Sequence, residues 1–79
     1  MKTTTHFERT IAERGIEREW CERVVASPIF KDTMASGRIR YYGYIEERGK
    51  DLRVVLLADG ATYHTAFFDS GFRKRKKQR

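Results

Sequence analysis

The sequence predicts an α+β domain with two N-terminal helices packed on one face of a three- to four-stranded antiparallel sheet. Apolar residues recur at helical spacing up to about residue 27, and at every second position beyond residue 36. Glycine-containing turns at 48–50 and 59–60 separate the alternating segments, as in a meander of hairpins. A chain of 79 residues has room for one core, so we expect a single domain over residues 1–72.

The first helix is expected over residues 6–14. Thr5 and Glu8 have the spacing of a capping box, in which each side chain accepts a hydrogen bond from the backbone of the other. Phe7 begins an apolar stripe. Gly15 can adopt the left-handed conformation that ends many helices.

A second helix is expected directly after Gly15. Its apolar positions recur at helical spacing and are Ile16, Trp20, Cys21, Val24 and Val25. The helix should end near Ser27, because Pro28 disfavours a helical conformation in the residue before it.

The alternating segments are expected to form strands at 38–45, 52–57 and 61–67, with a fourth short strand around 29–33. If both turns are two-residue hairpin loops, Leu56 faces Tyr63 and Ile45 faces Leu52. The side chains that then face the helices are Ile39, Tyr41, Ile45, Leu52, Val54, Leu56, Tyr63 and Phe67. The opposite face carries Arg40, Tyr42, Tyr44, Arg53, Thr62 and His64, with Val55, Leu57 and Ala66 between them.

This opposite face suits single-stranded RNA. Bases stack on aromatic rings while guanidinium groups bind phosphates, so we expect Arg40 and Tyr44 to contact nucleic acid. Tyrosine also has a high strand propensity, so a solvated sheet face without a ligand is the alternative interpretation.

RNA cleavage needs only proton transfer and stabilisation of charge on the phosphate, so neither a metal nor a cofactor is expected. The candidate catalytic residues are His64 or Tyr42 as acid or base, and Arg53 as a phosphate clamp together with Arg40. A purely structural role for His64 in the strand is the alternative.

The last seven residues carry the whole net charge of +6. Without their six basic side chains, the 17 Lys and Arg fall to 11, equal to the 11 Asp and Glu. Such a block repels itself and attracts polyanions, so we expect residues 73–79 to be a disordered tail that binds RNA or DNA. Its expected binding residues are Arg73, Lys74, Arg75, Lys76 and Lys77. A tail that only aids solubility is the alternative.

The sequence also predicts a cytoplasmic protein without a metal site. Cys21 is the sole cysteine and cannot form an internal disulfide, and no N-terminal apolar run has the length of a signal peptide or membrane span. With only His6 and His64 beside it, a structural metal site has little support.

The run from His6 to Ile16, with Arg9, Arg14 and Gly15 within it, resembles the opening of a bacterial family, the domain of unknown function 4258. The likeness continues through segments 37–42, 51–55 and 63–67. This family is distantly similar to small ribonuclease toxins of the RelE and BrnT type. The resemblance implies a RelE-like fold, RNA binding across the sheet and an antitoxin that covers the active surface, with His6, Arg9 and Arg14 as family motif residues.

We therefore expect an RNA-binding, toxin-like domain, and the sequence leaves open whether it is an endoribonuclease. A noncatalytic module that docks another protein, or nucleic acid, is the alternative. Oligomeric state, RNA sequence preference, ribosome dependence and the identity of an antitoxin do not follow from the sequence.

Overall fold

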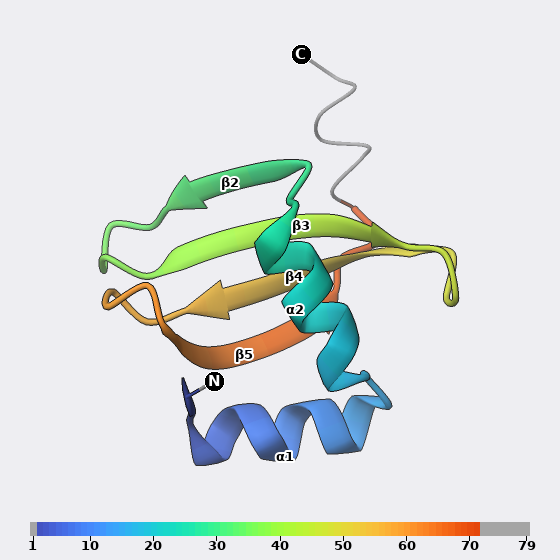
Figure 1. The fold of residues 1–79 in the computed structure, drawn as a ribbon, viewed down its shortest axis with the longest axis horizontal. Coiled ribbons are helices and arrows are strands. Elements are labelled where there is room, and N and C mark those ends of the chain that lie inside the picture. Colours follow the sequence, from blue (N-terminus) through green and yellow to red (C-terminus); the bar gives the residue numbers. More distant parts are fainter. Residues whose placement is uncertain (1, 72–79) are drawn as a thin grey trace.

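A computed structural model describes residues 2–71, which form two helices and five strands. The helices are α1 (Thr5–Arg14) and α2 (Arg18–Ala26), and the strands are β1 (Lys2–Thr3), β2 (Phe30–Thr33), β3 (Ile39–Ile45), β4 (Lys50–Leu56) and β5 (Thr62–Phe68). All five strands form one sheet in the order β1-β5-β4-β3-β2 (Figure 1). The expected tail, residues 73–79, lies outside the described residues.

The predicted α+β class with two helices is confirmed, but the sheet is not the antiparallel sheet of three or four strands that we predicted. β1 is a fifth strand that runs parallel to β5, with Lys2 opposite Thr62 and Thr3 opposite Tyr63. The other neighbouring strands are antiparallel. A strand of two residues is too short to produce an alternating pattern, so periodicity could not predict it.

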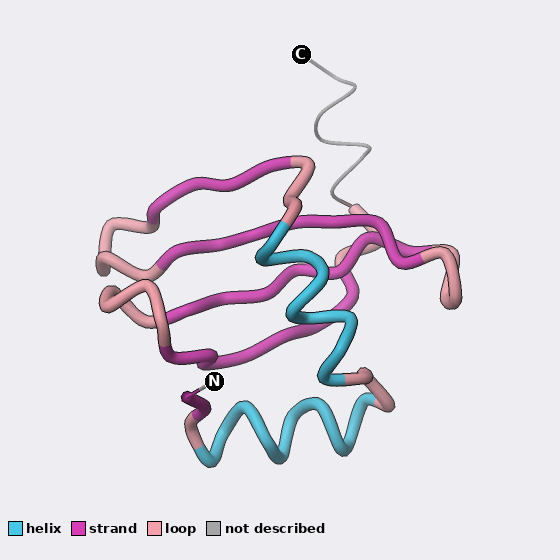
Figure 2. The backbone as a smooth tube through the Cα atoms, viewed as in Figure 1, coloured by secondary structure: helices cyan, strands magenta, loops and turns pink. Residues whose placement is uncertain are grey.

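The two helices occupy different places on the sheet. α2 crosses over β3 and β4, whereas α1 runs along the β5 edge (Figure 1 and Figure 2). α1 begins one residue earlier than predicted because Thr4, not Thr5, is its N-cap, with Oγ1 of Thr4 accepting from the backbone N–H of the third helical residue. The carboxylate of Glu8 does not complete a capping box, since it accepts hydrogen bonds from Thr3 and Arg18.

α2 lies close to the sheet because β3 carries a glycine beneath it. A Cβ atom at Gly43 would come within 2.9 Å of Cγ2 of Val24, which is buried. Cys21, on the same side of α2, is fully buried, and this burial raises the pKa of its thiol to about 12. The thiol is therefore protonated at neutral pH and is not a nucleophile.

The register between β3 and β4 is offset by two residues from the prediction. Ile45 faces Lys50 rather than Leu52, because the connecting turn takes four residues, 46–49. Tyr42 consequently faces Arg53. An offset of two keeps every side chain on its predicted face.

A bulge in β5 exchanges two side chains between the faces. Val55 faces Thr65 and Leu56 faces Tyr63. His64 has no residue opposite it in β4 and is the extra residue of the bulge. Beyond the bulge the alternation is reversed, since an inserted residue shifts it by one. Ala66 is therefore in the core and Phe67 faces Arg53, so the predicted places of Ala66 and Phe67 were wrong.

The core lies between the helices and the sheet. Its buried members are Phe7, Ile11, Ile16, Trp20, Cys21, Val24, Tyr41, Ile45, Leu52, Val54, Leu56, Tyr63 and Ala66. Burial of these side chains against one face leaves the other face of the sheet as the place for a site.

Candidate nucleic-acid interface

The sheet face turned away from α2, called the outer face below, carries the predicted site residues of the sheet, which are Arg40, Tyr42, Tyr44, Arg53 and His64. Its side chains alternate with the core positions along each strand. They are Arg40, Tyr42 and Tyr44 in β3, Asp51, Arg53 and Val55 in β4, and Thr65 and Phe67 in β5.

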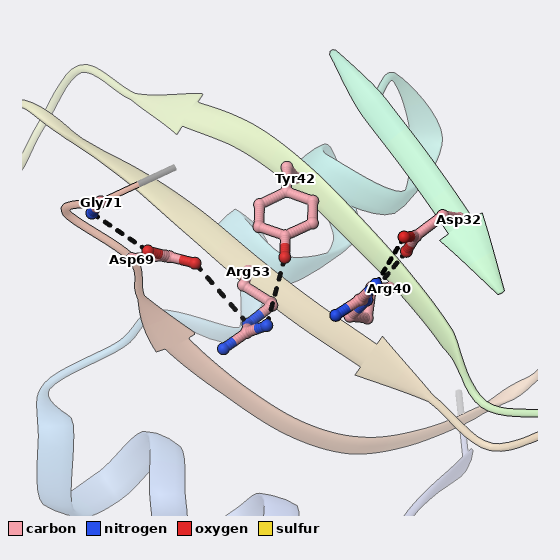
Figure 3. A network of polar contacts seen from close by, with 6 residues as sticks. All are labelled: Asp32, Arg40, Tyr42, Arg53, Asp69 and Gly71. Carbon is pink, nitrogen blue, oxygen red and sulfur yellow. Dashed lines mark hydrogen bonds and ion pairs between the residues drawn. The ribbon is translucent and has the colours of Figure 1, made fainter. Parts of the chain in front are cut away.

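Arg53 lies at the centre of the outer face (Figure 3). Its Nη1 donates a hydrogen bond to the hydroxyl of Tyr42 at 3.2 Å, and its Cζ lies 4.2 Å from the ring centroid of Phe67. Its Nε is 4.0 Å from a carboxylate oxygen of Asp69 and makes no hydrogen bond within residues 2–71. Two rings and the carboxylate of Asp69 therefore surround this guanidinium.

Arg40 is already engaged by an acidic neighbour (Figure 3). Its Nε donates to Oδ1 of Asp32 on the adjacent strand β2 at 2.8 Å, and its Nη2 donates to Oδ2. This pairing lowers the pKa of Asp32 and raises that of Arg40. A phosphate at Arg40 would have to compete with a bidentate carboxylate.

The two tyrosines of the outer face have different environments. Tyr42 is 3% exposed, and the ring of Phe30 lies 5.8 Å from its own ring. Burial of this kind argues that Tyr42 supports Arg53 and does not transfer protons to a ligand. Tyr44 is 45% exposed. It lies opposite Asp51, which is two residues before Arg53 in β4.

α1 brings a second set of side chains to the outer face. His6, Thr10 and Arg14 recur every four residues and so form one stripe of the helix. The ring of His6 lies 5.2 Å from that of His64, and Cζ of Arg14 lies 5.9 Å from the ring centroid of Phe67. The stripe therefore extends the outer face beyond β5.

The environment of His64 favours its neutral form. Its Nδ1 is buried and has no hydrogen-bond partner in the part of the chain that the structure describes. Burial lowers the pKa of His64 below its ordinary value, and the nearby Arg38 and His6 lower it further. A neutral imidazole can accept a proton.

The structure separates His6, Arg9 and Arg14, the three residues named in the family resemblance. His6 and Arg14 contact the outer face, whereas Arg9 is an exposed residue between them in sequence that does not share their stripe. Arg73, Lys74, Arg75, Lys76 and Lys77 lie outside the described residues. The chain leading to them is held near Arg53, because the backbone N–H of Asp69 donates to the carbonyl of Asp51 and that of Gly71 donates to the Asp69 carboxylate (Figure 3).

Several residues of the interface did not emerge from the sequence. Strand alternation predicts Phe67 in the core, because no pattern in the sequence marks the bulge at His64. Asp32 and Asp69 were not identified either, since a carboxylate that pairs with an arginine from another strand leaves no local signal.

Across residues 2–71, no three His, Cys, Asp or Glu side chains gather closely enough to hold a metal ion. Neither α1 nor α2, the helices of this range, has the length and apolar character needed to cross a membrane.

No family model, no curated protein and no solved structure matches this chain.

Proposed function

We propose that this protein is a toxin-like domain that binds single-stranded RNA on its outer face, along β4 and β5. One observation carries the proposal: the ring of Phe67 contacts the guanidinium groups of Arg53 from β4 and Arg14 from α1. Bases stack on aromatic rings and on guanidinium planes, and the same guanidinium groups offer the adjoining phosphates positive charge.

The pairing of Arg53 allows a phosphate to bind. The distance of 4.0 Å between Nε of Arg53 and Oδ2 of Asp69 exceeds that of a charge-assisted hydrogen bond, about 2.7–2.9 Å. A phosphate oxygen can therefore compete with Asp69 for the guanidinium of Arg53, whose side chain is 23% exposed, while Phe67 and Tyr42 keep it in place.

The basic segment that follows Gly71 supplies attraction for the phosphate backbone without regard to sequence. Gly71, the last described residue before this segment, is hydrogen-bonded to Asp69, so we expect one RNA strand to contact both the segment and the outer face. The resemblance to ribonuclease toxins adds a proposed partner, a small acidic antitoxin that covers the outer face.

Titration of a labelled single-stranded RNA with the full chain at several salt concentrations tests the proposal. Arg53→Ala and Arg14→Ala should each weaken binding. Arg23→Ala is the matched control, because it removes the same charge from α2, where Arg23 pairs with Glu47. A further full-length variant replaces the basic residues of 73–77 by glutamine and should reduce the salt dependence. If only this last variant loses affinity, RNA does not bind the outer face.

A noncatalytic protein-docking function is the second candidate, and one feature favours it. Ile29 and Tyr44 are 55% and 45% exposed, and both line a groove of about 430 Å³ beside the end of α2. β2, the strand that follows Ile29, is the sheet edge opposite β1, and an edge strand can pair with a partner strand. Under this function Ile29→Asp would abolish capture of a partner protein, whereas Arg53→Ala would not.

A further inference from the structure

Two histidines from distant parts of the chain meet at the β5 edge of the outer face. His6 belongs to the first turn of α1 and His64 to the bulge of β5. Their ring centroids are 5.2 Å apart and their planes are inclined by 30°. These are the only two histidines of the sequence.

Neighbouring threonines contact the backbone of His64 and the ring of His6. Oγ1 of Thr4 caps α1 and donates to the backbone carbonyl of His64 at 3.2 Å, so the start of the helix is attached to the bulge itself. Oγ1 of Thr10, which is buried, lies 3.5 Å from Nε2 of His6. The contact between the rings therefore follows from how α1 is attached to β5.

The two imidazoles differ in their access to solvent. His6 is exposed, so water can reach its ring. His64 is half-buried, and Nδ1 is its buried nitrogen, which leaves Nε2 for a ligand. Burial and the charge of Arg38 disfavour protonation of His64, so it is the member of the pair suited to act as a base.

We infer that His64 and His6 are the proton-transfer pair of an RNA-cleaving site at the α1–β5 edge, an inference that rests on the proposed RNA binding. His64 takes the proton of a ribose 2′-hydroxyl, and the 2′-oxygen forms a bond to the adjacent phosphorus. The bond from phosphorus to the 5′-oxygen breaks, and His6, in its protonated form, gives that oxygen a proton. The products are a 2′,3′-cyclic phosphate and a 5′-hydroxyl, so the step balances without an oxidant or another reactant.

Nearby cations can stabilise the charge that develops on the phosphate. Arg14 lies on the same stripe of α1 as His6, and Arg38 is exposed and close enough to His64 to influence its protonation. Tyr42 does not serve as the second proton-transfer group because it is 3% exposed. In this site the general acid is therefore His6, a residue of α1.

Incubation of the full chain with an end-labelled single-stranded RNA, in a buffer containing a chelator, tests this inference. Binding is measured in parallel with an all-deoxy strand of the same sequence, which lacks the attacking hydroxyl and should bind without being cut. His6→Gln and His64→Gln should each slow cleavage by about 100-fold or more. Arg23→Gln, on the helix-covered side, is the control and should cleave like the wild type.

The pH dependence of cleavage separates catalysis from a structural role. The wild-type rate should rise and then fall with pH, as expected for one base and one acid. His64→Gln should lose the rising limb and His6→Gln the falling limb, whereas a folding defect would lower the rate at every pH. Thermal unfolding of each variant shows whether the fold is retained.

Four results would overturn the inference, and they can be told apart. RNA that is bound but stays intact removes cleavage and leaves the proposed function in place. RNA that is not bound removes both. Cleavage at wild-type rates by His6→Gln and His64→Gln, or cleavage that yields other end groups, assigns the activity to different residues.

Discussion

The guanidinium of Arg53 lies over the ring of Phe67, with 4.2 Å between Cζ and the ring centroid, and the two residues face one another across β4 and β5. The contact depends on the bulge at His64, without which Phe67 would point into the core. The same local irregularity thus places the ring beneath Arg53 and the imidazole beside α1.

Phe67→Leu should weaken RNA binding while leaving the fold intact. Leucine keeps apolar volume but provides no ring, and the loss of one base stack costs about 1–3 kcal/mol of binding free energy. Phe68→Leu is the matched control, because Phe68 packs on the core near Trp20 and should lower stability without changing RNA affinity. Equal RNA affinity of the two variants would contradict the role of Phe67.

Asp32→Ala should strengthen RNA binding at a small cost in stability. The substitution frees Arg40, which lies on the outer face and is otherwise held by Asp32. Both side chains of this pair are about one-third exposed, so its loss should reduce the free energy of unfolding by no more than about 1 kcal/mol. Chemical denaturation and RNA titration measure the two effects, and unchanged RNA affinity would mean that Arg40 does not reach the ligand.

Protonation of His64 should reduce the free energy of unfolding in mildly acidic solution. Its pKa in the folded state lies below the ordinary value of 6.5, because its burial and the charges of Arg38 and His6 disfavour the imidazolium. The unfolded state therefore binds the proton more readily, and the free energy of unfolding should decrease as the pH falls below 6.5. His64→Gln should flatten this dependence, measured above the range in which carboxyl groups titrate. An identical slope in the variant would contradict the prediction.

Gly43→Ala should destabilise the protein by about 1–3 kcal/mol, as expected when a packed core receives an additional methyl group. The new Cβ would lie 2.9 Å from Cγ2 of Val24, so either α2 or β3 has to move. Val24→Ala removes that methyl group, and the double variant should be more stable than the sum of the single effects predicts. Strict additivity in a denaturation cycle would show that the glycine is not required for this close approach.

The predictable part of the fold was the part that local patterns encode. The left-handed Gly15, with φ of 67°, ends α1 as expected, and Pro28 follows the end of α2. The short strand predicted around 29–33 is β2. Each of these features depends on neighbours within a few residues.

The remainder depends on contacts between distant segments. No local signal distinguishes Thr4 from Thr5 as the N-cap, and Thr4 is selected because the same hydroxyl also reaches His64. Strand alternation correctly predicted that Arg53 and His64 lie on the outer face. It could not predict the side chains beside them, Asp69 and His6, because these come from other parts of the fold.

The pairing of α1 with β5 also determines the order of events during synthesis. Phe7 is fully buried, and its ring lies 5.4 Å from that of Tyr63, so the first helix cannot bury this side chain until nearly the whole domain has left the ribosome. Until then the nascent chain exposes an apolar helix face without its partner strand, and contacts this distant in sequence are slow to form. His6 and His64 also meet only when α1 packs on β5, so a cell would encounter the completed pair only on the folded domain.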